Sequence, residues 1–328
     1  MTEFPQGLAG RRFVLCAMAL GGLGLNPLRA HAATVLRVGL SQPIFSFLPL
    51  DIGLDAGVFA RHGITVEKTV FAGSAKLHQA IAAGAIDIGL GAGPELGFIA
   101  KGSPEMAVAA TADLPRELAI SVLKDGPIKA VSDLKGKRLS VSTKGSLTEW
   151  GGQELSRQQG WGSDGIKLLP LGSFGAQVAA LKTRQIDGMV VEASTAGRME
   201  EQDVGRTLVT FEKLVPAFHV HMIFASNALI KDRPDGIRAF LAGWFESLDS
   251  MRAHRAEALV VASRVLDLSP GLAGKLYDDL MPMYNATGRF NPEAVNILLK
   301  AGMDMGDLAT RPDPTKLIDD RFLPPDRL

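Results

Sequence analysis

A chain of 328 residues, of which 46% are hydrophobic and 21% charged, is long enough for two compact domains and too apolar to be disordered. Its 35 basic residues balance its 35 acidic residues, and this balance excludes the strongly cationic surface typical of nucleic-acid-binding proteins. The composition is that of an ordinary soluble globular protein, and we expect no nucleic-acid partner.

The first 32 residues have the pattern of a secretory signal. Arg11 and Arg12 precede an apolar run over 13–25, and small residues before and at Ala32 provide a cleavage site. The apolar run is too short to span a bilayer. The adjacent arginines also fit a twin-arginine export signal, so both export routes stay open. We predict a cleavable signal over residues 1–32 and a periplasmic mature protein.

The only cysteine, Cys16, lies inside the apolar part of this signal. It stands too early, and in the wrong local context, to be a lipid-attachment site at the cleavage point. The mature chain is therefore expected to have no disulfide, no thiol nucleophile and no cysteine-ligated metal. We predict a freely diffusing protein that needs no cofactor.

One pattern of strands and helices occurs twice, about a hundred residues apart. Each copy contains an apolar strand, a helical stretch, a second strand, a Gly-Ser pair (Gly73-Ser74 or Gly172-Ser173), a helix and an Ile-Asp strand. Short strands that alternate with helices predict α/β layers, with largely parallel strands and helices on both faces. The duplication predicts two lobes with a ligand-binding cleft between them.

The predicted fold class is therefore α/β, with two βα-repeat lobes joined by two crossover segments. Lobe 1 is assigned residues 33–120 and 220–328, and lobe 2 residues 121–219. An extended segment at 117–123 leaves the first lobe, and an apolar strand at 219–225 returns to it. The spacing of apolar residues predicts strands and helices at the following positions: strands over 35–40, 65–71, 86–90 and 106–110, and C-terminal helices, expected to cover the first lobe, over 235–250, 256–265, 270–280 and 292–303.

The Gly-Ser pairs fall where a strand ends and a helix begins. Glycine lets a ligand approach the backbone there, and the free amides of the helix start favour an anion or a carbonyl oxygen. Ser74 is the strongest single candidate for a ligand contact. The alternative is that Ser74 and Ser173 only cap their helices.

The other loops at strand ends converge on the same edge of each sheet. Gln42 can donate and accept hydrogen bonds, and Phe45 or Phe47 can cover an apolar part of a ligand unless it packs in the core. The predicted ligand-binding residues are Ser41, Gln42, Phe45, Gly73, Ser74, Gly93, Glu95, Thr143, Gly145, Ser146, Glu192, Ser194 and His219.

Charged residues near the cleft leave the charge of the ligand open. Lys144 suits a sulfonate or carboxylate, although a loop lysine is often only solvated. Glu192 directly follows the second Ile-Asp strand and favours an amine or a ring N–H. If Glu192 instead pairs with Arg198, this inference fails.

No motif indicates metal or covalent chemistry. His219 and His221 alternate on one strand and face the same side, but no cysteine or clear carboxylate group completes a metal site. The chain has no phosphate-binding loop, no His-Glu-x-x-His and no nucleophile elbow. Asp87 and Asp187 occupy equivalent positions of the repeat, which favours structural roles over paired catalytic acids. We predict no catalytic residue.

Three segments carry a resemblance to a known family: DAGVFARHGI over 55–64, the Gly-Ser pair at 73–74 with AIAAGAIDIG over 80–89, and VSDLKGKR over 131–138. They resemble periplasmic substrate-binding proteins of importers for nitrate, taurine, alkanesulfonates and thiamine-pyrimidine precursors. The resemblance implies a two-lobed Venus-flytrap receptor that docks on an ABC permease of the inner membrane.

The expected function is capture of a small organic solute, either a sulfonate, a taurine-like compound or a pyrimidine-like compound, by a monomer. One alternative is an enzyme on the same scaffold that acts on a pyrimidine or a small organic acid, because pyrimidine-precursor synthases resemble this group. The export signal argues against that alternative. A periplasmic sensor domain is the other, because one docking surface can serve a permease or a sensor.

Overall fold

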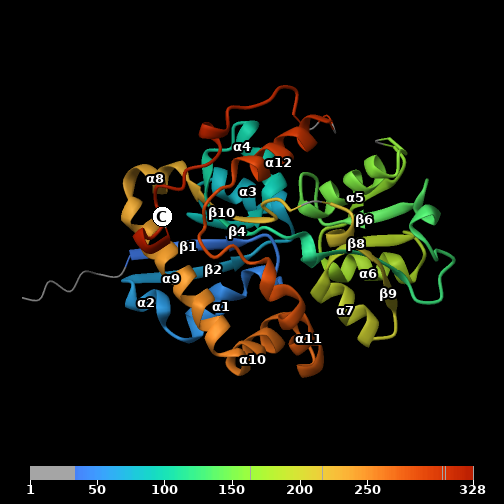
Figure 1. Cartoon of the computed structure of the whole chain (residues 1–328), viewed down its shortest axis with the longest axis horizontal. Coiled ribbons are helices and arrows are strands. Elements are labelled where there is room, and N and C mark those ends of the chain that lie inside the picture. The colour runs from blue at the N-terminus through green and yellow to red at the C-terminus, as the bar shows by residue number, and fades with distance from the viewer. Residues whose placement is uncertain (1–33, 163, 216, 305, 307, 328) are drawn as a thin grey trace, which may run out of the picture. The chain divides into compact units, whose positions relative to one another are not determined.

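The structure is a computed structural model that describes residues 34–162, 164–215, 217–304, 306 and 308–327. The predicted export signal lies outside the described residues. Within them the chain forms two five-stranded sheets (Figure 1). The first sheet has the strand order β2-β1-β3-β10-β4, and the second has the order β7-β6-β8-β5-β9. Among the described residues, no helix has the length and apolar character needed to cross a bilayer.

The first sheet consists of β1 (Thr34–Leu40), β2 (Ile64–Val70), β3 (Ile88–Ala92), β4 (Glu105–Ala112) and β10 (His221–Ser226). The second consists of β5 (Leu118–Leu123), β6 (Arg138–Val141), β7 (Lys167–Pro170), β8 (Gly188–Glu192) and β9 (Gly205–Thr210). The helices are α1 (Leu48–Asp55), α2 (Val58–Arg61), α3 (Ser74–Ala82), α4 (Leu96–Ala100), α5 (Leu147–Gln158), α6 (Phe174–Lys182), α7 (Ala193–Glu201), α8 (Asn227–Asp232), α9 (Pro234–Ala253), α10 (Arg255–Leu266), α11 (Pro270–Leu280) and α12 (Pro292–Asp304).

The predicted α/β class, the two-sheet repeat and the largely parallel strands are confirmed, and one strand in each sheet runs antiparallel to the others. In the first sheet β1 is parallel to β2 and β3, whereas β10 runs antiparallel between β3 and β4. In the second sheet β5 runs antiparallel between β8 and β9. These two strands follow the segments that cross between the sheets. They enter their sheet at the carboxyl ends of the parallel strands and therefore run in the opposite direction.

The crossings lie between strands of different sheets. Residues 113–117, which include the 3-10 helix η3 (Pro115–Glu117), connect β4 to β5, and residues 211–220 connect β9 to β10. The extended segment predicted at 117–123 is thus largely the strand β5. The strand predicted at 219–225 is β10, which begins two residues later.

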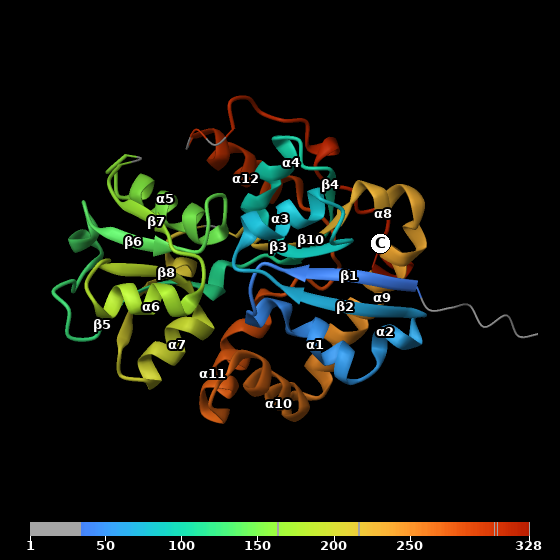
Figure 2. The ribbon, with the colours of Figure 1, turned by 180° about the vertical axis from the view of Figure 1, so that it is seen from behind.

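Of the C-terminal helices, α9 and α10 pack against elements of the first half of the repeat, whereas α11 also contacts α7 of the second half. Helix α9 contacts α1, α2 and β2, and α10 contacts α1 (Figure 2). Helix α9 carries Phe240, Leu241 and Trp244 into the core, where each is fully buried. Burial of large apolar side chains of this kind contributes roughly 1.5–3 kcal/mol each, so α9 contributes substantially to the core.

An equivalent ion pair is present in each copy of the repeat. Asp87 accepts hydrogen bonds from the Arg37 backbone N and Nε at 3.0 and 2.9 Å, and Asp187 accepts the same pair from Arg138 at 2.9 and 3.0 Å. Each carboxylate therefore ties the residue before one strand to an arginine of the neighbouring strand, Asp87 before β3 to Arg37 within β1 and Asp187 before β8 to Arg138 at the start of β6. The predicted structural role of the two aspartates agrees with this geometry, since they serve separate sheets.

We expect Asp87→Asn to destabilise the protein more than the matched substitution Asp187→Asn. The Asp87 side chain is 6% exposed and also pairs with Arg233, whereas Asp187 is 27% exposed. Loss of hydrogen bonds to a buried charge should cost about 2–3 kcal/mol for Asp87→Asn, and the more exposed pair about 1 kcal/mol. Urea unfolding of both variants measures the difference, and equal midpoints would contradict it.

Candidate functional site

Loops from both sheets meet around a small cavity at the carboxyl ends of β1, β3, β6 and β8. A volume of about 10 Å³ is open to the centre of a water molecule there, which corresponds to roughly one water. The cavity is lined by Ser41, Gln42, Ile44, Ser74, Ala92, Glu95, Ser142, Ser146, Leu147, Thr148, Glu192 and His221. Its small size follows from direct contacts between the two sheets.

One hydrogen bond spans the two sheets inside the cavity. Gln42, which follows β1, donates its side-chain N–H to the carboxylate of Glu192 at the end of β8. Glu192 is 6% exposed. The Gln42 amide and the Glu192 carboxylate, which come from different sheets, thus satisfy each other's hydrogen-bonding capacity in this arrangement of the sheets.

A second contact between the sheets depends on a glycine. Gly73 has φ +104°, a conformation that side chains rarely adopt, and a Cβ at this position would lie 2.3 Å from the Thr143 methyl carbon. The next amide but one, Ala75 N–H, donates to Thr143 Oγ1 at 3.3 Å. The loop before α3 and the loop after β6 therefore approach closely because position 73 has no side chain.

Ser74 does not cap helix α3, because Gly73 is the N-cap residue. The Ser74 hydroxyl instead donates to Glu95 at 2.5 Å, and His78 Nε2 contacts the other oxygen of Glu95 at 2.7 Å. His78 Nδ1 contacts Glu105 at 2.9 Å. The ring also stacks on Phe98 with centroids 4.5 Å apart. A buried chain of hydrogen bonds therefore fixes Glu95 at the cavity wall.

The imidazole of His78 is charged at neutral pH. Burial opposes protonation, but hydrogen bonds to Glu105 and Glu95 outweigh it and raise the pKa of His78 to about 9. One imidazolium thus lies between the side chains of Glu95 and Glu105.

A third carboxylate, Glu117, is fully buried behind the cavity. The backbone N–H of Ser46 donates to Glu117 Oε1 at 3.2 Å, and the Ser46 hydroxyl donates to Oε2. His221 Nε2 lies 3.3 Å from Glu117 Oε2, at ion-pair distance although without hydrogen-bond geometry. The surroundings of the cavity are therefore acidic.

Burial raises the pKa of Glu192 to about 7, from an ordinary value of 4.5. This value is the net result of several effects. The charge of nearby Glu117 also raises the pKa of Glu192, whereas the charge of His221 and the hydrogen bond from Gln42 lower it. Glu192 therefore exchanges a proton near neutral pH.

The structure brings together six of the thirteen predicted ligand-binding residues at this cavity: Ser41, Gln42, Ser74, Glu95, Ser146 and Glu192. Gly73 and Thr143 form the close contact beside it. Gly93 and Gly145 line a neighbouring pocket, which Ser146 shares. Ser146 is also the N-cap of α5, and its hydroxyl accepts from the Glu149 backbone N–H at 3.3 Å.

Three predicted residues lie elsewhere. Phe45 is fully buried in the core, where its ring meets Tyr277 edge-on. Ser194 is buried in the first turn of α7. His219 uses both ring nitrogens within the fold: Nε2 accepts from Asn291 N–H at 2.7 Å, so Nδ1 carries the proton and donates to Asp113 at 2.7 Å.

Sequence reasoning missed His221, Ser142 and Thr148 as cavity residues. The sequence pattern pairs His221 with His219 on one predicted strand, but which of the two reaches the cavity depends on which one faces Glu117. The hydroxyl of Thr148 accepts from Ser142 N–H at 2.9 Å, a local turn that carries no distinctive motif. In the part of the chain that the structure describes, no group of three or more histidine, cysteine, aspartate or glutamate residues could hold a metal ion.

Comparison with solved structures identifies the class of fold. The alkanesulfonate-binding protein SsuA from Xanthomonas axonopodis pv. citri, bound to MOPS, is similar with TM-score 0.76 and 18% identity over 87% of this chain and 98% of that chain. The nitrate-binding protein NrtA from Synechocystis PCC 6803 gives TM-score 0.70 and 14% identity over 88% and 87%. The desulfurization enzyme DSZB gives TM-score 0.61 and 15% identity over 88% and 97%.

The fold is therefore that of the periplasmic substrate-binding proteins, a scaffold that also carries an enzyme. No curated protein matches the chain in sequence. Residues 45–258, more than half of the chain, match the model of the NMT1/THI5-like family, and the chain belongs to that family. Its structural neighbours include binding proteins for sulfonates and nitrate, in agreement with the resemblance found in the sequence.

We expect the stability of the wild-type protein, relative to Glu192→Gln, to increase as the pH falls from about 7 to 4.5. The folded pKa of about 7 exceeds the ordinary value of 4.5, so the folded state binds the proton more tightly in this window. The full difference corresponds to roughly 3 kcal/mol. Chemical unfolding of both proteins across this pH range measures it. A constant difference would show that Glu192 is not buried as described.

We expect His78→Gln to cost about 3–5 kcal/mol of stability, because it leaves two buried carboxylates without a counter-charge. His62→Gln is the matched control: His62 pairs with Glu246 at the surface, where the expected cost is below about 1 kcal/mol. Thermal or urea unfolding compares the two variants. A similar small loss in both would mean that the Glu95 and Glu105 carboxylates do not depend on the imidazolium.

Proposed function

We propose that the chain is the extracytoplasmic solute-binding component of an ABC import system and captures one small organic solute in the cleft between its two sheets. The hydrogen bond between Gln42 and Glu192 carries this proposal, because it joins the two sheets directly at the loops where such a solute is expected. Hydroxyls of Ser41, Ser74 and Ser146 surround it. Membership of the NMT1/THI5-like family and the fold shared with SsuA and NrtA support it.

The proposed lobes are built on the two sheets. We assign the crossings at 113–117 and 211–220 as the hinge, which places β5 in the second lobe and β10 in the first. A solute that contacts Gln42 on one side and Glu192 on the other takes the place of their mutual hydrogen bond. Because it binds groups of both lobes at once, it favours the closed arrangement over the open one.

The cavity chemistry favours a solute with N–H donors. Glu95 and Glu192 are acceptors, and no lysine or arginine is among the residues that line the cavity. A simple anion would place like charges together in a medium of low dielectric constant. Of the solute classes considered, taurine-like compounds carry an ammonium group and aminopyrimidines carry N–H groups, so both are preferred over plain alkanesulfonates.

The proposed partner is an ABC permease in the inner membrane, and the proposed location is the periplasm. A monomer suffices for this role, because both faces of the cleft come from one chain. Docking would require the closed, solute-bound arrangement to present a surface that the open one does not.

The change in melting temperature on addition of three small compounds tests the proposal. Taurine or 4-amino-2-methylpyrimidine is expected to raise the melting temperature, since a ligand of the closed form stabilises it by mass action, whereas methanesulfonate is expected to have little effect. Gln42→Ala should weaken binding of the active probe by roughly tenfold to a hundredfold, the effect of a lost hydrogen bond to a charged group.

Gln202→Ala, an exposed substitution outside the cavity, is the matched control and should leave binding unchanged. Mass spectrometry of each incubated probe separates capture from turnover. Chemical conversion of a probe would favour an enzyme over a receptor, and the absence of any shift together with no solute in native mass spectra of the periplasmic protein would reject the proposal.

A further inference from the structure

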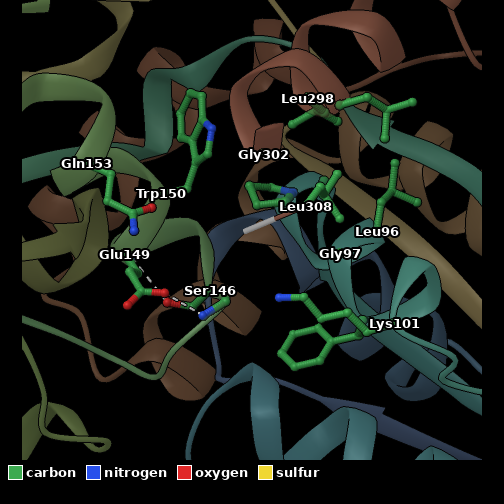
Figure 3. Close-up of a pocket in the computed structure, with 15 residues that line it drawn as sticks. Leu96, Gly97, Lys101, Ser146, Glu149, Trp150, Gln153, Leu298, Gly302 and Leu308 are labelled. Atoms are coloured by element: carbon green, nitrogen blue, oxygen red, sulfur yellow. Dashed lines mark hydrogen bonds between the residues drawn. The ribbon is translucent and has the colours of Figure 1, made fainter. Parts of the chain in front are cut away.

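A second cavity, shown in Figure 3, shares the lining residue Ser146 with the small one. About 50 Å³ of it is open to the centre of a water molecule, which is room for about three to five waters. This is the bulk of a single ring or a short branched alkyl group. Its walls come from η2 (Gly93–Glu95), α4, α5 and α12, so both sheets contribute elements to it.

The body of this cavity is apolar. Leu96 of α4, Leu298 of α12 and Leu308 beyond that helix face it from one side (Figure 3). Burial of a hydrocarbon group against such walls is favourable at roughly 25 cal/mol per Å² of apolar surface. The small cavity, by contrast, is lined mainly by hydroxyl and carboxylate groups.

A buried hydrogen-bond donor without a partner lies in the wall. Trp150 of α5 is 5% exposed, and its indole N–H meets no acceptor among the described residues. Figure 3 shows the indole nitrogen on the edge of the ring that faces Leu298. A buried donor without a partner is unfavourable for the protein alone. A ligand that brings an acceptor to this position therefore recovers a loss that the protein carries alone.

Lys101 adds a positive charge at the mouth. Its amino group points toward the cavity in Figure 3, and within the described ranges it forms no ion pair or hydrogen bond. The one carboxylate in the wall, Glu149, is turned toward the start of α5, where Gly145 N–H donates to it at 2.6 Å. The cavity thus combines an apolar body with two donors.

We propose that this cavity is a subsite for an apolar-bodied acid, a ring or branched alkyl group whose carboxylate or sulfonate oxygen accepts hydrogen bonds from the Trp150 indole and the Lys101 ammonium. The inference rests on the proposed function, because the subsite holds the distal part of the solute captured in the cleft. It adds a chemical requirement that the small acidic cavity alone does not impose.

Benzoate is the probe, with acetate as the acid that lacks the ring and benzyl alcohol as the ring that lacks the acid. Benzoate is expected to bind at least tenfold more tightly than either, measured by titration of the tryptophan indole ¹⁵N–¹H signals. Only one of the three indole signals, assigned to Trp150 by its loss in Trp150→Phe, should move with benzoate. Equal binding of acetate and benzoate, or an unmoved Trp150 signal, would overturn the proposal.

Gly97→Phe is expected to fill the subsite, because Gly97 of α4 lines the cavity and a Cβ there meets no atom within 4 Å. It should weaken benzoate binding at least tenfold. Gly175→Phe in α6 is the matched control, since its Cβ also meets no atom within 4 Å but lies outside the cavity. Unchanged benzoate affinity in Gly97→Phe would place the probe elsewhere.

Lys101→Gln should remove the preference for benzoate over benzyl alcohol while binding of benzyl alcohol persists. A preference that survives in this variant would contradict the assigned role of Lys101. These outcomes are separate from the proposed function. If benzoate does not bind but an N–H-bearing probe still binds at Gln42 and Glu192, the subsite is rejected and the proposed function stands. If benzoate binds but no N–H-bearing probe does, the subsite stands and the solute class assigned to the small cavity is rejected.

Discussion

The architecture of the site depends on how buried carboxylates are compensated where the two sheets meet. Burial of a charge is costly unless the charge is paired and hydrogen-bonded. Glu95 is held by His78 and Glu117 by Ser46, partners that belong to the first sheet and its loops. Glu192 differs, because its hydrogen-bond partner Gln42 comes from the other sheet. The contact between the sheets and the protonation of Glu192 are therefore linked through one carboxylate, whose pKa burial raises to about 7.

Carboxylates are also compensated toward the opposite ends of the strands, where the resulting ion pairs stabilise each sheet. Asp87 and Asp187 each bind both the backbone and the side chain of an arginine on a neighbouring strand, Arg37 within β1 and Arg138 at the start of β6. These pairs are complete within one sheet and need nothing from the other. The ion pairs at the amino ends thus stabilise each half separately, which leaves the carboxyl ends, where Gln42 and Glu192 meet, as the place where the halves interact.

The sequence predicts the repeat, the position of most strands and the loops that form the cavity, because these depend on local periodicity and on glycine. It does not predict the antiparallel strands β5 and β10, whose direction follows from the path of the chain between sheets. It also cannot decide which of several nearby candidate side chains reaches the cavity. Phe45 enters the core and His219 binds Asp113, whereas His221, two residues later, reaches the cavity. Such choices depend on tertiary neighbours that no local pattern contains.

The two cavities share Ser146 but have opposite chemistry, and this difference restricts what one solute can be. On one side Glu95 and Glu192 accept hydrogen bonds and disfavour an anion, while on the other Trp150 and Lys101 donate and disfavour a cation. A solute with one polar end only would leave one of these sets unpaired, and buried polar groups without partners reduce affinity. Under the two proposals, a compound with an N–H group at one end and an apolar acid at the other would satisfy both sets, and charge would fix its orientation in the cleft. The opposing charges that Lys144 and Glu192 suggest in the sequence would then act in different cavities, with Lys101 as the proposed donor.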